Sequence, residues 1–104
     1  MKKMNKKTEA LMKTLTTENV AVIHAAFEDT PRTVAFVEVD KLMTVDEKLE
    51  EAFMLTNTID ASWYTGDKVN YIGPEKYCRS TAVGDFVLVG KTKYECKDTG
   101  WSEV

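Results

Sequence analysis

The C-terminal segment, residues 79–104, constrains the fold of this chain more than any other part, because its pattern is that of a compact β unit. Gly84 and Asp85 are typical of a tight turn, and the β-branched and aromatic run from Phe86 to Val89 is typical of a strand. Gly90 and Lys91 then reverse the chain, and a second strand runs toward Trp101. The segment therefore predicts a hairpin that closes an antiparallel sheet.

A second hairpin is predicted earlier in the chain. Residues 20–27 and 33–39 are rich in Val, Ile, Phe and Ala, and the turn formers of residues 28–32 separate them. Alternation along the second strand places Val34, Phe36 and Glu38 on one face and the remaining residues on the other. Because both faces carry apolar side chains, the pattern predicts a strand that is covered at least partly on both sides.

The strongest helix signal follows this hairpin. Thr44 and Glu47 have the spacing of a capping box, in which each side chain bonds an unpaired backbone N–H at the helix start. The helix is predicted over residues 45–57. Its apolar stripe, which would pack on the sheet, consists of Val45, Leu49, Ala52, Phe53 and Thr56.

The N-terminal part of the chain has a weaker pattern. Residues 8–15 can form a short helix with Leu11, Met12 and Leu15 on one face, and residues 1–7 are expected to be a disordered leader. The whole chain, residues 1–104, is predicted to be one α+β domain. It consists of a small antiparallel sheet, one packed amphipathic helix and an N-terminal helical segment, in the order α-β-β-α-β-β.

Composition excludes several classes of protein. No apolar run approaches the roughly 18 residues of a membrane span, and the N-terminus lacks the apolar core of an export signal, so a cytoplasmic location is expected. Cys78 and Cys96 are too few for a zinc site of four ligands and are expected to be reduced thiols. The glycines form no phosphate-binding motif, and we expect no cofactor and no metal.

Enzymatic interpretations find little support. His24 lies in the middle of a predicted strand with no nucleophile or orienting acid near it in sequence, which favours a structural histidine. Asp85 is expected to bond its own turn, although with Ser80 and Thr81 it could form a small polar site. A small hydrolase or transferase would need a deep pocket that joins these three residues to His24. We therefore predict no catalytic residues.

Binding interpretations find more support. The predicted helix presents an acidic face, and aromatic residues lie in the long connection that follows it; aromatic residues on loops often anchor partners. A solvated helix face and aromatic residues that cover the core remain the alternative interpretations. The predicted partner-binding residues are Asp46, Glu47, Glu50, Glu51, Trp63, Tyr64, Tyr71 and Tyr77.

Charge is distributed unevenly and leaves a nucleic-acid interpretation open. Residues 1–18 carry five lysines and two glutamates, residues 19–62 three basic and nine acidic residues, and residues 63–104 six of each. A nucleic-acid site would use the N-terminal lysines together with a basic stripe on the C-terminal hairpin, although Glu95 lies in the same row. Its candidate residues are Lys2, Lys3, Lys6, Lys7, Arg79, Lys91, Lys93 and Lys97.

Three segments resemble known small proteins. Residues 49–60 followed by Trp63, the Arg-Ser-Thr-Ala-Val-Gly-Asp sequence of residues 79–85, and residues 100–104 are similar to uncharacterised accessory proteins of phages and plasmids. The last sixty or so residues also resemble the C-terminal part of YodL-like domains of mobile elements, which have a Ser-rich turn before a closing hairpin.

The resemblance implies a phage or mobile-element protein that acts in the cytoplasm of a bacterial host. It transfers no catalytic residues, because its motifs are turn and core positions. It implies binding to a host protein, such as a nuclease, a polymerase or a defence complex, and modulation or inhibition of that protein. Nucleic acid remains a possible partner, no membrane is implied, and both a monomer and a homodimer are compatible with the sequence.

Overall fold

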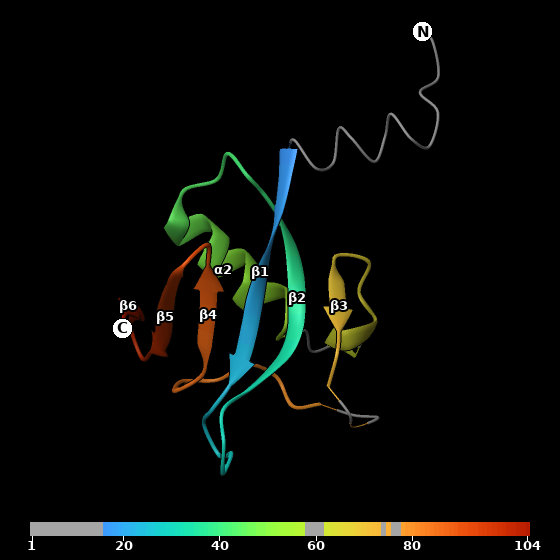
Figure 1. Cartoon of the computed structure of the whole chain (residues 1–104), viewed down its shortest axis with the longest axis vertical. Helices are drawn as coiled ribbons and strands as arrows, with labels where there is room; N and C mark the ends of the chain where they lie inside the picture. Colours follow the sequence, from blue (N-terminus) through green and yellow to red (C-terminus); the bar gives the residue numbers. More distant parts are fainter. Residues whose placement is uncertain (1–15, 58–61, 74, 76–77) are drawn as a thin grey trace, which may run out of the picture.

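The computed structural model describes residues 16–57, 62–73, 75 and 78–104 of the chain. These residues form an α+β fold with one six-stranded antiparallel sheet and one α-helix, which confirms the predicted class (Figure 1). The predicted N-terminal helix and leader lie outside the described residues. The elements are β1 (Thr17–His24), β2 (Arg32–Asp40), α2 (Val45–Leu55), the 3-10 turn η1 (Trp63–Thr65), β3 (Val69–Tyr71), β4 (Phe86–Val89), β5 (Thr92–Lys97) and β6 (Gly100–Glu103).

The predicted hairpin of residues 20–39 is formed by β1 and β2, the third and second strands in the order β3-β2-β1-β4-β5-β6. Val22 pairs with Ala35, whereas Ile23 pairs with Thr33, so Val34 is an extra residue on β2. Such a bulge bends the strand and increases its twist. Val34 is fully buried in the core rather than lying on the face of Phe36 as strict alternation predicted.

Helix α2 begins where the sequence predicted, because the capping box is present. The Glu47 N–H donates to Thr44 Oγ1 over 3.2 Å, and the Thr44 N–H donates to Glu47 Oε1 over 2.9 Å. The helix ends at Leu55, two residues before the predicted end. There the Thr56 hydroxyl turns back to donate to the Ala52 carbonyl over 2.7 Å.

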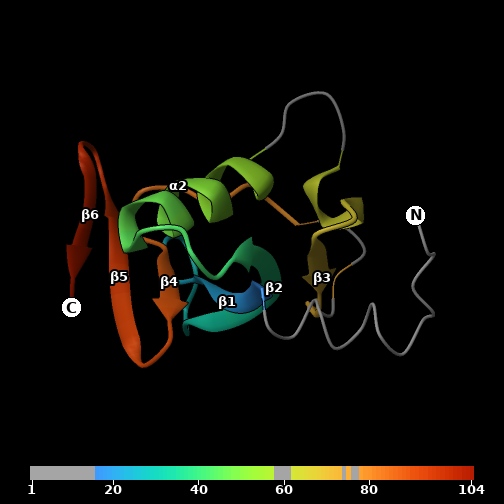
Figure 2. The ribbon, with the colours of Figure 1, turned by 90° about the horizontal axis from the view of Figure 1, so that it is seen from above.

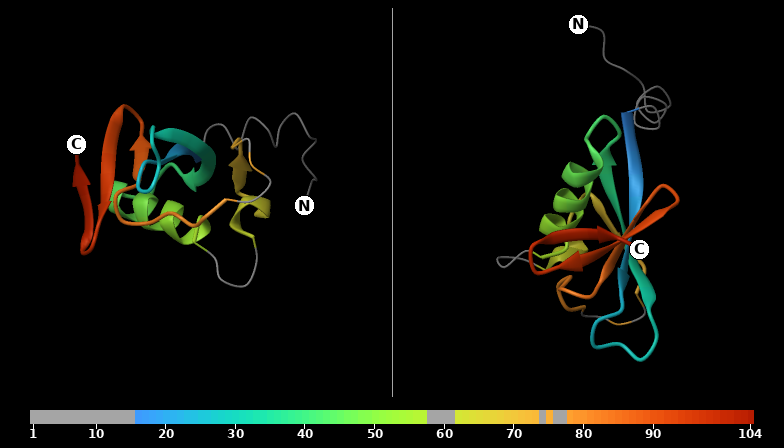
Figure 3. Two further views of the ribbon diagram at one scale, coloured as in Figure 1. Left: turned by 90° about the horizontal axis from the view of Figure 1, so that it is seen from below. Right: turned by 90° about the vertical axis from the view of Figure 1, so that its left-hand side faces the viewer.

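The core lies between α2 and one face of the sheet (Figure 2). Leu49 and Ala52 of the helix pack against alternate residues of the central strands, and Trp63 of η1 extends the same cluster. Figure 3 (right) shows α2 on one side of the β1 and β2 ribbons, with no described helix on the other side. The prediction that β2 is covered at least partly on both faces is thus confirmed for the face toward α2, whereas Phe36 on the other face is 36% exposed.

The sheet has two strands that the sequence analysis missed. β3 lies within the connection predicted to be irregular and pairs with β2, from Val37 and Val69 to Ala35 and Tyr71. β6 follows a turn that ends at Gly100, whose φ of 115° belongs to the left-handed region that favours glycine. The described order is thus β-β-α-β-β-β-β. Three residues are too few for alternation to reveal β3, and β5 and β6 resemble one continuous strand in sequence.

Candidate functional site: the Arg79–Asp85 clamp and the Phe27 turn

The turn of residues 79–85, which we call the clamp, docks on the β1–β2 connection. Gly84 has a φ of 95°, and a Cβ added there would lie 3.1 Å from the Ala26 Cβ. Glycine therefore permits both the left-handed backbone and the close approach of the two turns. On its other side the clamp meets the end of α2, where the Thr81 N–H donates to the Thr56 carbonyl over 3.1 Å.

The centre of the clamp is the fully buried carboxylate of Asp85. Its Oδ1 accepts the backbone N–H groups of Ala25 and Ala26 at 2.8 and 2.9 Å, and its Oδ2 accepts that of Ala82 at 2.8 Å. Arg79 donates to both oxygens, from Nη1 to Oδ2 over 2.6 Å and from Nη2 to Oδ1 over 2.9 Å. Asp85 thus bonds its own turn, as the sequence predicted, and also a second turn 60 residues away.

These hydrogen bonds decide the charge of the pair. Burial by itself raises the pKa of Asp85, but the Arg79 guanidinium and the three backbone N–H donors outweigh it and lower the pKa below its ordinary value. The same pairing raises the pKa of Arg79. The carboxylate is therefore ionised and its lone pairs are already used, so it has little capacity left to act as a base.

The clamp fixes the turn of residues 25–31, which we call the Phe27 turn. Besides the two N–H groups bound by Asp85, the Ala26 carbonyl accepts a hydrogen bond from Arg79 Nη2. The next residue, Phe27, has a φ of 63°, which is uncommon for a residue other than glycine and costs about 1–2 kcal/mol. Its side chain is 89% exposed, and Arg79 Cζ lies 5.4 Å from the ring centroid. The strained backbone of this turn therefore keeps the Phe27 ring exposed to solvent.

Beside the clamp, buried hydroxyl groups connect His24 to the helix end. His24 Nε2 lies 3.1 Å from Thr81 Oγ1, which lies 2.8 Å from Thr56 Oγ1. Because the Thr56 hydroxyl donates to the Ala52 carbonyl, Thr81 must donate to Thr56. Thr81 then accepts from His24, so His24 carries its proton on Nε2. This assignment follows from the hydrogen-bond directions.

The other nitrogen of His24 faces a thiol. Cys78 Sγ lies 3.7 Å from His24 Nδ1, which is unprotonated in this tautomer and can accept the S–H. Burial lowers the pKa of His24, although Asp85 nearby opposes this, and burial also raises the pKa of Cys78. The two groups therefore form a neutral pair, not the thiolate and imidazolium of a cysteine nucleophile.

Cys78, His24 and Asp85 lie in a row, as the nucleophile, histidine and acid of a catalytic triad do. Their hydrogen bonds, however, are not those of a triad. Asp85 Oδ2 lies 3.9 Å from His24 Nε2 and makes no hydrogen bond to it, because Thr81 occupies that place. His24, Thr81 and Asp85 are brought together, but each is at most 2% exposed. Ser80, the fourth residue of the predicted polar site, contributes its carbonyl as an acceptor for Arg79. The geometry favours a structural cluster.

The predicted partner-binding residues divide into two groups. On α2, Asp46, Glu47 and Glu50 are exposed and Glu51 is half-buried, so the acidic face reaches solvent. Glu47 also caps the helix, and its pKa is lowered by the Thr44 backbone N–H and hydroxyl. Glu50 Oε1 accepts a hydrogen bond from the Trp101 indole over 3.3 Å.

The aromatic group lies mainly in the core. Trp63 is 3% exposed and its indole N–H lies within 3.2 Å of the Cys78 and Arg79 carbonyls. Tyr64 and Tyr71 are half-buried and meet Trp63 edge-on, at ring-centroid distances of 5.6 and 5.7 Å. Trp63 thus covers the core and is not a surface anchor. Tyr77 lies outside the described residues.

The residues of the nucleic-acid interpretation are also separated. Lys93 and Lys97 share one face of β5 with Glu95, which bonds Lys97 over 3.0 Å. Lys91 is exposed in the β4–β5 turn, and Arg79 is engaged in the clamp. The lysines at positions 2, 3, 6 and 7 lie outside the described residues. No continuous basic surface is found in the described part of the chain.

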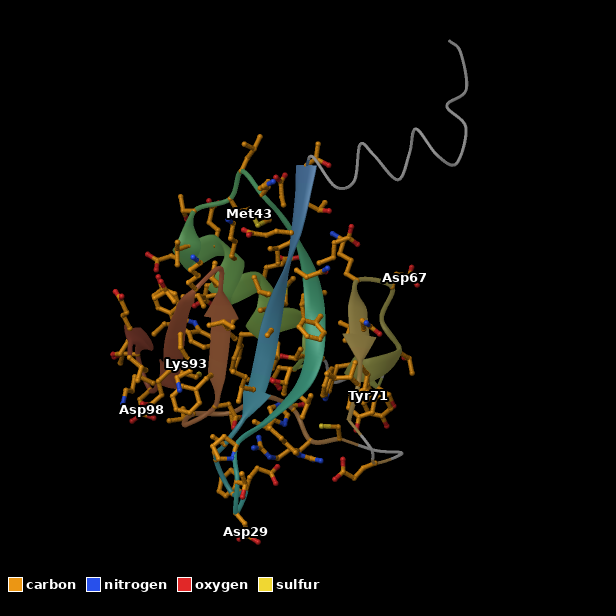
Figure 4. All side chains as sticks on the ribbon, in the orientation of Figure 1. Asp29, Met43, Asp67, Tyr71, Lys93 and Asp98 are labelled. Atoms are coloured by element: carbon orange, nitrogen blue, oxygen red, sulfur yellow. The ribbon has the colours of Figure 1, made fainter. Side chains whose placement is uncertain are left out.

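Two surface hollows lie away from the clamp. One, of about 420 Å³, lies where β1, β2 and the turn before β3 meet, and its lining includes Glu38, Asp40 and Lys68. Asp67, labelled in Figure 4, lies at its rim. A smaller hollow of about 180 Å³ lies beside Trp101. Among the described residues, no three His, Cys, Asp or Glu side chains are grouped closely enough to hold a metal ion.

Sequence reasoning missed Phe27 because it placed this residue at the end of the first strand, before the turn formers of residues 28–32. Only its position next to that turn signalled exposure. No helix in residues 16–57, 62–73 or 78–104 is both long and apolar enough to cross a membrane. Comparisons of the chain with protein-family models, curated proteins and solved structures gave no match.

Proposed function

We propose that this protein is a non-catalytic accessory protein of a phage or another mobile element, and that it binds and modulates a host protein in the bacterial cytoplasm. The resemblance of residues 79–85 and 100–104 to such proteins supports the origin. The observation that carries the binding role is the exposed Phe27, held in a left-handed backbone by the clamp.

The left-handed backbone of Phe27 opposes stability, and its exposed side chain gains almost no burial energy on folding, so stability does not explain its presence. Strained residues and preorganised aromatic side chains are concentrated where proteins bind ligands. A fixed turn loses little conformational entropy on binding, and a Phe side chain can bury more than 150 Å² in a partner. The Phe27 turn therefore has the properties of a preformed anchor.

The charge around the anchor indicates the kind of partner. Asp29 is exposed at the tip of the turn (Figure 4), and Glu28 lies 3.6 Å from Arg79 and 4.0 Å from Arg32. Both arginines are engaged by carboxylates, whereas Asp29 is presented to solvent. The complementary surface is an apolar pocket with a basic rim on a protein.

A second contact region is proposed at the start of α2, at the opposite end of the sheet from Asp29 and near Met43 in Figure 4. Leu42 is 91% exposed there, next to the exposed carboxylates of Asp46 and Glu47. This region includes part of the acidic helix face that the sequence predicted as a partner-binding surface. The predicted anchor Trp63 is buried, so we propose Phe27 as the apolar anchor instead.

The chemistry of the buried cluster supports the non-catalytic part of the proposal. His24 and Cys78 are a neutral hydrogen-bonded pair, and Asp85 is saturated by Arg79 and backbone donors. None of these groups is both activated and accessible, which a nucleophile or a general base requires.

The test is a tagged pull-down from lysate of a bacterial host at low and high salt, with and without nuclease, read by mass spectrometry. Phe27→Asn keeps a residue that tolerates a left-handed backbone and removes the ring. Val104→Asn is the control, because Val104 is also an exposed apolar residue. We expect one stoichiometric protein that survives nuclease, is lost with Phe27→Asn and is retained with Val104→Asn.

Two results would count against the proposal. Capture that is unchanged in folded Phe27→Asn and in the double variant Leu42→Asn with Asp46→Lys would exclude both contact regions. Capture that disappears with nuclease or with salt would instead favour the alternative function, nucleic-acid binding through the N-terminal lysines, Lys93 and Lys97.

A further inference from the structure

The smaller hollow beside Trp101, which we call the Trp101 hollow, lies between α2 and the β5–β6 hairpin. Its lining includes Glu50 and Phe53 of α2, Asp98 of the hairpin turn and Trp101 of β6. Trp101 pairs with Cys96 across the ladder, and residues paired in this way point to the same side of the sheet. Cys96 also lines the hollow and is 5% exposed, so it lies at the base.

Two aromatic rings form adjoining walls of the Trp101 hollow. The ring planes of Phe53 and Trp101 meet at 81°, with their centroids 6.3 Å apart. Both side chains are half-buried, so part of each ring reaches solvent. The face of an aromatic ring carries a partial negative charge and attracts a cation that lies within about 6 Å of its centre. Two rings nearly at right angles therefore form a corner suited to a cation.

Carboxylates stand beside these rings. The Trp101 indole N–H donates to Glu50 Oε1 over 3.3 Å, which holds the carboxylate against the ring. That bond uses one oxygen, and Oε2 of Glu50 has no hydrogen-bond partner among the described residues. Asp98 is exposed in the β5–β6 turn (Figure 4), and within the same part of the chain its side chain makes no hydrogen bond or ion pair. Both carboxylates can therefore accept hydrogen bonds from a ligand.

The charge of the hollow is negative although Lys97 contributes to its lining. Lys97 Nζ lies 3.0 Å from Glu95 Oε2, and alternation along β5 places Glu95 on the opposite face from Cys96. The ammonium group is thus directed away from the hollow. Burial raises the pKa of the Cys96 thiol, and nearby carboxylates, Glu50 and Asp98 among them, raise it further. This effect on the thiol shows that negative charge dominates at the base.

Size, shape and charge together indicate the occupant. The hollow has a volume of about 180 Å³, equal to roughly six waters of about 30 Å³ each, and pockets for whole small molecules measure about 300–1,000 Å³. It therefore fits one side chain, and its carboxylates repel an anion. A guanidinium group is planar, stacks on aromatic rings and has five N–H donors, whereas a lysine ammonium is a compact and strongly hydrated charge. The corner of rings and carboxylates matches the guanidinium.

We propose that the Trp101 hollow binds an arginine side chain on the surface of a partner protein, with the guanidinium stacked on Trp101 and bonded to Glu50 and Asp98. This inference goes beyond the proposed function, because the hollow shares no residue with the Phe27 turn or with the second contact region at the start of α2. One small group gains little net affinity by itself, so isolated arginine should bind with a dissociation constant on the order of 10 mM.

The test is a titration of the nitrogen-15-labelled full chain with Nα-acetyl-arginine amide at constant ionic strength, followed by two-dimensional NMR. The chain has two tryptophans and therefore gives two indole N–H signals. We expect the signal of Trp101 to shift and saturate, while that of Trp63, which is buried in the core, stays in place as an internal control. Nα-acetyl-citrulline amide, which has nearly the same shape but no charge, should cause no saturable shift.

Variants connect the binding to the two carboxylates. Glu50→Gln keeps an acceptor for the indole N–H but removes the charge, and it should raise the dissociation constant about threefold, the effect of an exposed charge. Asp98→Asn should do the same, and the two together should raise it about tenfold. Glu51→Gln, the same change on the next residue of α2, is the matched control and leaves the constant unchanged. Phe27→Asn also leaves it unchanged, so this proposal and the proposed function can fail separately.

Several results would overturn the arginine site. The first is a Trp101 signal that does not move, or that moves equally with the citrulline compound. The second is a dissociation constant that neither Glu50→Gln nor Asp98→Asn changes. Tighter binding of Nα-acetyl-lysine amide would assign the hollow to an ammonium group, and tighter binding of free L-arginine would assign it to the amino acid rather than to a protein side chain.

Discussion

Arg79 and Asp85 are joined by two N–H···O bonds, 2.6 Å from Nη1 to Oδ2 and 2.9 Å from Nη2 to Oδ1, beneath the turn that presents Phe27. Bidentate pairs of this kind are strong and fix geometry as well as charge. Here the pair also binds the backbone on both sides of it, at Ala26 and Ala82. One ion pair thus sets the shape of two turns.

Asp85→Asn should strongly destabilise the fold. The amide cannot accept all the hydrogen bonds of the carboxylate, and it leaves the Arg79 guanidinium without its counter-charge. Removing one partner of a buried pair costs about 3–5 kcal/mol, to be measured by urea unfolding. Glu95→Gln, which breaks an exposed pair with Lys97, should cost less than about 1 kcal/mol. Equal losses would show that the clamp contributes no special stability.

Gly84→Ala should cost more than Gly90→Ala. Both glycines have positive φ, but nothing lies within 4 Å of a Cβ added to Gly90, whereas the Ala26 Cβ lies 3.1 Å from one added to Gly84. The left-handed backbone accounts for about 1–2 kcal/mol in each variant, and the contact adds about another 1 kcal/mol at Gly84. Thermal unfolding of the two variants would measure the difference, and its absence would mean that the two turns can move apart.

His24 should make stability depend on pH between neutral and mildly acidic conditions. Burial lowers its pKa in the folded state, so below about pH 6.5 the unfolded chain binds a proton that the folded chain does not. The free energy of unfolding then falls as the pH falls, by at most about 1.4 kcal/mol per pH unit, until the lower folded pKa is reached. Urea unfolding at pH 7.5, 6.5 and 5.5 should show this slope in the wild type and a flatter one in His24→Gln. Identical slopes would assign the dependence to other groups.

Cys78 should alkylate slowly at neutral pH. Burial raises the pKa of its thiol above the ordinary value of a cysteine, and the neutral His24 beside it supplies no positive charge to stabilise a thiolate. Iodoacetamide labelling followed by mass spectrometry across pH 6–10 should give a Cys78 rate no faster than that of an ordinary thiol. Rapid labelling near pH 6 would reveal an activated nucleophile and contradict the non-catalytic proposal.

Phe27→Gly should change stability by less than about 1 kcal/mol, although loss of a buried Phe side chain typically costs about 3–5 kcal/mol. Glycine relieves the left-handed strain of about 1–2 kcal/mol, while the lost contact with Arg79 and the more flexible unfolded chain offset that gain. Trp63→Ala, at a buried aromatic residue, is the contrasting variant in the same unfolding experiment. A large loss with Phe27→Gly would mean that the ring packs on the fold.

Local signals in the sequence were sufficient for the elements that local interactions determine. The capping box at Thr44 and Glu47 located the start of α2, and the glycines at positions 84 and 90 located the turns around β4. β3 escaped prediction because its three residues gain their structure from the neighbouring β2, a partner that lies more than thirty residues away. Trp63 could be a surface or a core residue in sequence, because its burial depends on the same distant packing.

The candidate site illustrates the same limit. Arg79, Thr81 and Asp85 stood out in sequence as a turn, but nothing in the order of residues connects that turn to residues 25–27. The contact exists because β1 and β4 pair as neighbours, which brings His24 and the Phe27 turn to the clamp. Tertiary pairing of strands far apart in the chain has no local signature.

The distance along the chain between the two turns has a consequence for biosynthesis. The β1–β2 hairpin can form as soon as its own residues leave the ribosome, but Asp85 is 59 residues beyond Ala26. Until the clamp has been translated and docked, the Ala25 and Ala26 amides lack their acceptor. Without these hydrogen bonds, nothing offsets the energetic cost of the left-handed backbone at Phe27. A nascent chain, or one truncated before Asp85, would therefore contain Phe27 without the fixed turn that presents its side chain. The ability to bind a partner would appear only when the clamp docks, near the end of synthesis.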